Sequence, residues 1–183
     1  MEPPGITRHR RPFLAPLWVT LLAAVAVGVI AWAFYRDAST TVVILVHSAE
    51  KTPGTIDDPP LSPEGEERAQ RLAQMFAGPT VGSIDAIYTS DDRRAQQTAA
   101  PLAERLHRVP ALLNPAEARA GAARALHEHG GGTVLMIVSG PALLQVLREL
   151  AGGVPAGAPD DPNLAYIISI PSVGHAHVVR LRM

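Results

Sequence analysis

The stretch TVVILVHSAEK, Thr41 to Lys51, joins an apolar run to a group of polar residues. Thr41 to Val46 shows no alternation of polar and apolar positions, which is typical of a strand covered on both faces. His47, Ser48 and Lys51 follow directly. Because ligands bind at the carboxyl ends of the strands in α/β sheets, we expect these side chains at the edge where a site would form.

Outward from this stretch, strand-like and helix-like segments alternate along the chain. We predict strands over 41–46, 86–89, 133–138, 165–170 and 175–181, and helices from Ser62, over 93–106, over 116–128 and over 142–151. This alternation indicates an α/β fold, a three-layer sandwich with a mostly parallel central sheet. The last two strands are predicted to be antiparallel neighbours or edge strands, and Pro101 to kink or break its helix.

The helix that begins at "LSPEGEERAQRLAQMF" carries clear start signals. Ser62 can cap it, Pro63 suits the first helical position, and glutamates follow in the first turn. Four apolar residues at helical spacing predict its buried stripe: Ala69, Leu72, Ala73 and Phe76. The Gly- and Pro-rich segment 152–163 is predicted to be a surface loop.

Composition sets the limits on function. The chain has 183 residues, 47% of them apolar, which suits one domain with a core. Its formal charge of −1 gives no field that would gather nucleic acid, so we expect no nucleic-acid partner. It contains no cysteine, which excludes disulfides, thiolate nucleophiles and Cys-ligated zinc.

The N-terminal part predicts a membrane span. Residues 13–35 contain no charge and are long enough as a helix to cross a bilayer core of about 30 Å. Arginines Arg8, Arg10 and Arg11 precede the span, whereas only Arg36 follows closely, which favours a cytoplasmic N-terminus. We therefore predict a single-pass membrane protein whose domain is extracytoplasmic, in the periplasm or at the cell surface.

The predicted organisation is a cytoplasmic tail (1–12), a transmembrane helix (13–35), a short linker (36–40) and one domain (41–183). A cleaved signal peptide is the alternative, because Ala31-Trp32-Ala33 is a small-x-small sequence. The apolar run is longer than the roughly 7 to 15 residues usual in signal peptides, which favours an uncleaved anchor.

Three segments are expected to converge at the carboxyl ends of the strands: His47 to Lys51, Ser90 to Arg94, and Ser139 to Pro141. Helix N-termini point their free amides at the same edge. Two cationic side chains, hydroxyl groups and helix N-termini together suit a dianion such as phosphate.

The ordered motifs "ILVHSAEK", "DPPLSPEGEERAQRLA", "YTSDDRRAQQTAAPLAERL", "TVLMIVSGPALLQVLRELAGG" and "VVRLRM" resemble the histidine phosphatase superfamily, also called the phosphoglycerate-mutase-like family. The resemblance covers nearly all of residues 41–183, and "YTSDDRRAQQTA" is its most specific part. It implies the fold of that family and a phosphatase, a phosphoric monoester hydrolase, as the activity.

The resemblance also implies roles for single residues. Members carry an Arg-His pair, as in "LVRHAEK", a second arginine in "SxxxRAxxTA", and a second histidine, as in "VVGHS". Arg94 matches the phosphate-binding arginine, with Ser90 and Lys51 as further candidate phosphate ligands. Without gaps, His47 takes the arginine position and Ser48 the nucleophile position, and the second histidine position falls on Ser139 or Gly140.

These replacements predict a weak or inactive phosphatase, a pseudoenzyme that still binds a phosphorylated small molecule or phosphoprotein. Serine lacks the nucleophilicity of neutral imidazole unless a base activates it. The alternative is a one-residue gap that makes His47 the phosphoryl acceptor of an active phosphomonoester hydrolase. The first strand would then end one residue early, and its register would turn His47 toward another face.

Other polar residues have simpler interpretations. Glu117 suits a solvated helix surface, and Asp57 and Asp58 suit a loop. His127 and His129 suit the end of a helix. His175 and His177 alternate on one face of the predicted last strand, where a third metal ligand is missing, so we expect neither a metal nor a cofactor.

Overall fold

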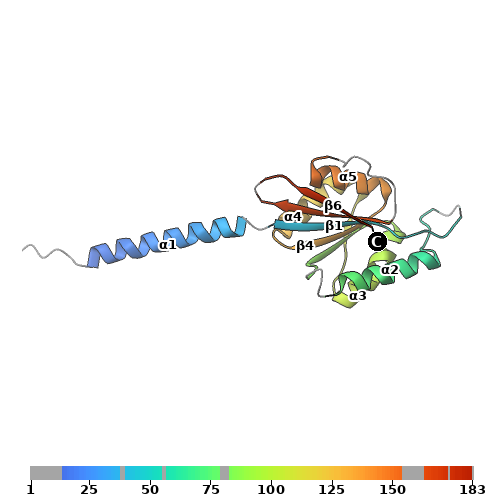
Figure 1. Ribbon diagram of the computed structural model, residues 1–183, viewed down its shortest axis with the longest axis horizontal. Helices are drawn as coiled ribbons and strands as arrows, with labels where there is room; N and C mark the ends of the chain where they lie inside the picture. The colour runs from blue at the N-terminus through green and yellow to red at the C-terminus, as the bar shows by residue number, and fades with distance from the viewer. Residues whose placement is uncertain are drawn as a thin grey trace, which may run out of the picture. The chain divides into compact units, whose positions relative to one another are not determined.

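The computed structural model describes residues 14–37, 40–54, 57–78, 83–153, 163–172 and 174–182, and the chain divides into two compact units, 1–37 and 38–183. The elements in chain order are α1 (Leu14–Asp37), β1 (Thr40–His47), α2 (Pro63–Phe76), β2 (Ala86–Ser90), α3 (Arg93–Leu106), β3 (Ala111–Leu113), the 3₁₀ turn η1 (Pro115–Glu117), α4 (Ala118–Glu128), β4 (Thr133–Val138), α5 (Gly140–Ala151), β5 (Leu164–Pro171) and β6 (His177–Arg182) (Figure 1).

The first unit contains one helix. Within α1, Leu17–Phe34 is apolar enough and long enough to cross a membrane, and this is the one such helix in the described part of the chain. A membrane anchor and a signal sequence share these properties, so length and composition fit both.

The second unit is built on a six-stranded mixed sheet in the order β3-β2-β4-β1-β5-β6. The strands β3, β2, β4 and β1 are parallel, whereas β5 pairs antiparallel with β1 and β6 pairs antiparallel with β5. This confirms the predicted α/β fold with a mostly parallel sheet and two antiparallel closing strands.

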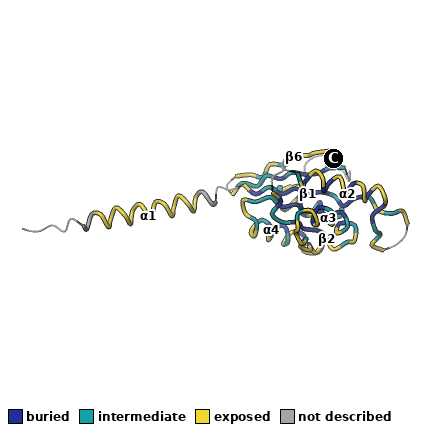
Figure 2. Tube along the Cα trace, turned by 90° about the horizontal axis from the view of Figure 1, so that it is seen from below, coloured by how far each residue is buried: buried dark blue, intermediate teal, exposed yellow. Residues whose placement is uncertain are grey.

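Helices cover both faces of the sheet and make three layers (Figure 1). On one face α4 and α5 pack against side chains such as Val43, Leu45 and Met136. On the other face α2 and α3 pack against Ile44, Val46 and Ile137. The central strands are therefore buried on both sides, as their continuous apolar runs predict, and Figure 2 shows them dark within the domain.

The start of α2 follows its sequence signals. The Ser62 hydroxyl accepts a hydrogen bond from the Gly65 amide at 3.1 Å, and Pro63 begins the helix. Hydrogen bonds from the backbone and from Ser62 hold the pKa of Glu64 below its ordinary value. The predicted stripe of Ala69, Leu72, Ala73 and Phe76 is buried.

Four details of the sequence prediction need correction. The short edge strand β3 was not predicted, because three residues give too little periodicity to detect. The helix α3 is not broken at Pro101, which lies inside it, and α5 begins at Gly140, two residues earlier than predicted. His175 precedes β6, so it does not alternate with His177 on that strand. The predicted loop at 154–162 lies outside the described residues.

Candidate functional site at the carboxyl ends of the strands

The three predicted segments meet in the structure. The Ser48 amide donates to the Val138 carbonyl at 3.0 Å, which ties the end of β1 to the end of β4. The Ser139 amide donates to the Ser90 hydroxyl oxygen at 3.2 Å, which ties the start of α5 to the end of β2. His47 closes the group, because its Nε2 lies 3.5 Å from the position that a Cβ on Gly140 would take.

His47 and Ser48 face different surroundings. His47 pairs in register with Val138 on the neighbouring parallel strand, and Val138 belongs to the core beneath α5, so His47 points to that face. Its side chain is half-buried. Ser48 is 1% exposed, and its hydroxyl has no hydrogen-bond partner among the described residues. An unpaired buried hydroxyl costs free energy, so this atom is a position where a ligand could supply the missing bond.

The tautomer of His47 follows from its one hydrogen bond. Nδ1 lies 2.8 Å from the Ser48 carbonyl oxygen, and a carbonyl can only accept. Nδ1 therefore carries the proton, and in the neutral ring Nε2 holds the lone pair next to the start of α5.

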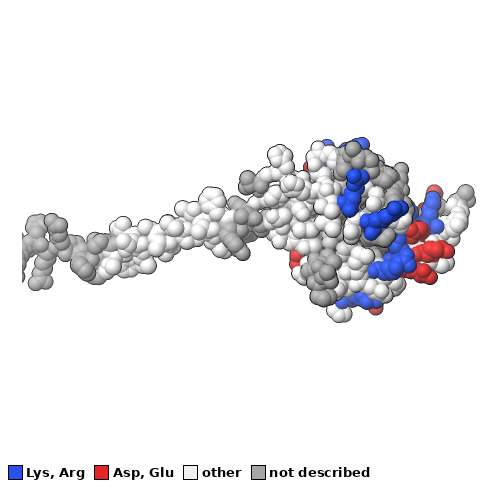
Figure 3. Space-filling view, viewed as in Figure 1, with Lys and Arg blue, Asp and Glu red and all other residues white. Residues whose placement is uncertain are grey.

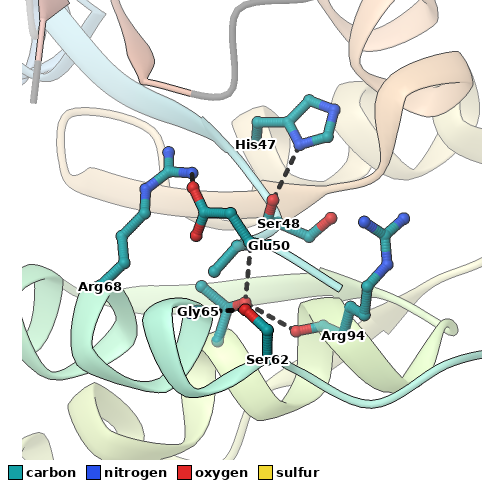
Figure 4. Close-up of polar contacts among 9 residues, drawn as sticks. His47, Ser48, Glu50, Ser62, Gly65, Arg68 and Arg94 are labelled. Carbon is teal, nitrogen blue, oxygen red and sulfur yellow. Dashed lines mark hydrogen bonds and ion pairs between the residues drawn. The ribbon is translucent and has the colours of Figure 1, made fainter. Parts of the chain in front are cut away.

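Arg94 lies in the first turn of α3 and is half-buried. Thr98 fixes this turn to the segment after β1: its hydroxyl donates to the Arg94 carbonyl at 2.7 Å and accepts from the Ala49 amide at 3.0 Å. No hydrogen bond or ion pair of the Arg94 guanidinium is present within the described chain. Figure 4 shows this guanidinium and the Ser48 side chain on the same side of the end of β1.

The N-terminus of α3 is occupied by two carboxylates. Asp92 caps the helix by accepting from the Ala95 amide at 3.2 Å, and it also accepts a hydrogen bond from the Ser90 hydroxyl. Asp58, from the loop before α2, accepts from the Arg93 amide at 2.7 Å. The N-terminus of α5 differs, because Ser139 makes no side-chain capping bond.

The helix α2 is locked to the segment after β1 (Figure 4). The Ser62 amide donates to the Glu50 carbonyl at 2.9 Å, and Arg68 pairs with the Glu50 carboxylate at 3.0 Å. A Cβ on Gly65 would lie 2.4 Å from the Glu50 carbonyl oxygen, so only glycine fits there. These contacts hold the turn that contains Ser48.

The surface of the domain carries both basic and acidic side chains. Figure 3 shows basic side chains across one face of the domain and acidic side chains gathered beside them. Mixed charge agrees with the net charge of −1, so a charged ligand would be recognised by a local arrangement of groups and not by a uniform field.

Several other predicted residues make no side-chain hydrogen bond or ion pair to this group within the described structure. Lys51 is exposed and pairs through its backbone with Leu61. Glu117 is exposed at the end of η1. His127 and His129 lie at the end of α4. In the described ranges no group of three or more His, Asp or Glu side chains has a geometry that could hold a metal ion.

Two residues that organise the site were not predicted to do so: Asp92, and Asp58, which the sequence assigns to an ordinary loop. Asp92 had a signal, because an aspartate directly before a helix is a favoured cap. The contact of Asp58 with Arg93 spans 35 residues, and no local pattern predicts it.

Comparison with known proteins agrees with this architecture. Residues 38–117 match the histidine phosphatase superfamily (branch 1). No curated protein matches the chain significantly in sequence.

Solved structures give the wider match. The protein histidine phosphatase SixA complexed with tungstate is similar with a TM-score of 0.62 and 19% identity, over 77% of this chain and 96% of that chain. Phosphoserine phosphatase from Entamoeba histolytica in complex with 3-phosphoglyceric acid has a TM-score of 0.59 and 16% identity, over 78% and 97%. At these identities the similarity establishes the fold. The sequence match over residues 38–117 is to the histidine phosphatase superfamily (branch 1), and the shared fold agrees with that match.

Proposed function

We propose that the domain binds the phosphate group of a phosphorylated small molecule or phosphoprotein and hydrolyses it slowly or not at all. The observation that carries this proposal is the half-buried Arg94 guanidinium, which has no acidic partner in the described structure and lies on the side of the unpaired Ser48 hydroxyl. A planar guanidinium suits a phosphate in a two-pronged contact. The uncapped start of α5 completes the proposed anion site, and Ser90 positions it, because its hydroxyl donates to Asp92 and accepts from the Ser139 amide.

Slow turnover follows from the side chain at the nucleophile position. The Ser48 hydroxyl is buried, and the one hydrogen bond of the His47 ring goes to the Ser48 carbonyl instead of the hydroxyl. A serine without an adjacent base is a poor nucleophile. No histidine stands at Ser139 or Gly140. β1 also keeps its register with β4 through His47, without the early end that the gapped alignment predicts.

A second candidate function is supported by the tautomer of His47. With Nδ1 protonated, Nε2 offers a lone pair beside the start of α5. In an active phosphatase this Nε2 would attack phosphorus, the bond to the leaving oxygen would break, and water would then hydrolyse the phosphohistidine. This candidate makes His47 indispensable, whereas the first makes it dispensable.

Variants of the full chain, purified in a nonionic detergent, separate the two candidates. We expect wild type to convert p-nitrophenyl phosphate near the background rate. The change His47→Arg with Ser48→His should raise the rate. Gly140→His is a further addition, since a Cβ at residue 140 would lie 3.5 Å from the present His47 Nε2, an ordinary contact distance. Strong wild-type activity that His47→Ala abolishes would establish the second candidate instead. Phosphoserine and a phosphohistidine protein are the first physiological ligands to assay.

We further propose that α1 anchors the chain, with residues 1–12 as a cytoplasmic tail, 36–40 as a linker and 41–183 as an extracytoplasmic domain. The apolar stretch Leu17–Phe34 of this helix supports the proposal, because apolar burial would hold it in the bilayer. The protein should stay in the membrane after a carbonate wash, and a reporter fused after Met183 should be extracytoplasmic. A soluble form that begins near Phe34 would show a cleaved signal sequence.

A further inference from the structure

The contact between Asp58 and α3 brings a carboxylate to a position that suits an anionic ligand. Asp58 lies in the loop between β1 and α2, far in sequence from the helix whose first amide it binds. Its carboxylate accepts from the Arg93 amide at 2.7 Å. Asp58 has a φ of 56°, in the left-handed region, which aspartate and asparagine adopt more readily than most residues other than glycine.

The Arg93 amide is one of the donors at the start of α3 that have no partner within the helix. Such amides, together with the positive end of the helix dipole, can bind anions. Arg94, the next residue, is the proposed phosphate ligand. A carboxylate bound to the Arg93 amide brings negative charge next to the Arg94 turn, and it occupies a donor that a phosphate could use. The Ser48 hydroxyl is buried, has no hydrogen-bond partner within the described chain and lies on the side of the Arg94 guanidinium, so it is a second group in this region that a ligand could bind.

We propose that Asp58 is a built-in competitor of the phosphorylated ligand at the start of α3. This inference rests on the proposed function, because it names the group that limits the same site. The Asp58 carboxylate lowers phosphate affinity through repulsion and through its hold on the Arg93 amide. Phosphate then binds mainly against Arg94 and α5, and ligands that displace Asp58 gain the α3 amide as well.

The neighbouring acid gives a matched control. Asp57 and Asp58 are adjacent, exposed and of the same charge, and within the described structure only Asp58 is hydrogen-bonded to α3. Asp58→Asn removes the charge and suits the left-handed conformation, because asparagine tolerates it well. Asp58→Gly also removes the contact without backbone strain. Asp57→Asn and Asp57→Gly change the net charge identically.

The test is a calorimetric titration of the full chain, in nonionic detergent, with inorganic phosphate. We expect Asp58→Asn to bind phosphate about threefold to tenfold more tightly than wild type, Asp58→Gly at least as tightly, and both Asp57 variants within about twofold of wild type. If wild type binds phosphate, and the Asp58 variants gain no affinity or gain no more than the Asp57 variants, the inference is overturned and the proposed function stands. No phosphate binding in any of the five proteins would overturn both.

Discussion

The N-termini of α3 and α5 lie at the same edge of the sheet but are capped differently. At α3, Asp92 and Asp58 occupy backbone amides, and Thr98 fixes the first turn to the chain after β1. At α5, Ser139 makes no capping bond. The α3 side is thus closed by the chain itself, whereas the α5 side leaves donors for a ligand.

This difference separates residues that stabilise the fold from residues that would bind a ligand. The closed side, formed by α2 and α3, positions Ser48 and Arg94 through buried backbone contacts. The open side carries the half-buried His47 and the small residue Gly140. Substitutions on the closed side should therefore change stability, and those that touch Arg94 or α5 should change ligand affinity.

The largest effect is expected where the closed side has no free space. Gly65→Ala places a Cβ 2.4 Å from the Glu50 carbonyl oxygen, so α2 or the turn after β1 must move. We expect a loss of about 2 to 4 kcal/mol in the free energy of unfolding, measured by urea denaturation.

Gly78→Ala is the control for this change, because its nearest neighbours would be 3.6 Å away. Equal stability losses in the two variants would show that α2 is not tightly fixed at Gly65.

Arg94 joins the two sides, because it lies on the closed side and its guanidinium is the proposed phosphate ligand. Arg94→Ala should weaken phosphate or vanadate binding by about 1.5 to 3 kcal/mol in calorimetry, the value of a charge-assisted hydrogen bond. The exposed neighbour Arg93 provides the control, and Arg93→Ala should have a much smaller effect. If both variants bind alike, Arg94 is a surface residue without a ligand role.

Thr98→Val should cost about 1 to 3 kcal/mol of stability, since it leaves the buried Ala49 amide without its acceptor. Thermal unfolding measures the change. Thr52→Val removes a half-buried hydroxyl bonded to the Leu61 carbonyl, and we expect a smaller loss there. A larger loss at Thr52 would mean that the Thr98 bridge is not the main support of the α3 turn.

The smallest effect is expected from a substitution that gives α5 a carboxylate cap, as α3 has. Ser139→Asp puts a carboxylate at an uncapped N-terminus, where the backbone of Ser139 already has the extended conformation of a cap. We expect about 0.5 to 1 kcal/mol of added stability together with weaker phosphate binding. Ser139→Ala should leave stability nearly unchanged, because no capping bond is lost. Undiminished phosphate binding in Ser139→Asp would show that the ligand does not use α5.

Much of the fold was readable from local pattern. The apolar runs of β1 and β4 and the cap at Ser62 predicted buried parallel strands and the start of α2, because each depends on residues close in sequence. The three-residue strand β3 and the position of His175 outside β6 were missed, since edge elements carry little periodicity.

The sequence predicted which segments form the candidate site, but not which residues in them contact each other. Strand ends had to converge, and they do. The Asp58 contact with Arg93 and the burial of the Ser48 hydroxyl depend on how distant segments pack. Sequence spacing contains no information about either of them.

The central claim is that the domain binds phosphate without efficient turnover, and ³¹P NMR of one sample tests both parts. The full chain in nonionic detergent is mixed with p-nitrophenyl phosphate, and its spectrum is followed over time. The account predicts that the ester signal broadens on addition of wild type but not of Arg94→Ala, while inorganic phosphate grows no faster than without protein. An ester signal that stays sharp, or rapid growth of inorganic phosphate that disappears in His47→Ala, would contradict it.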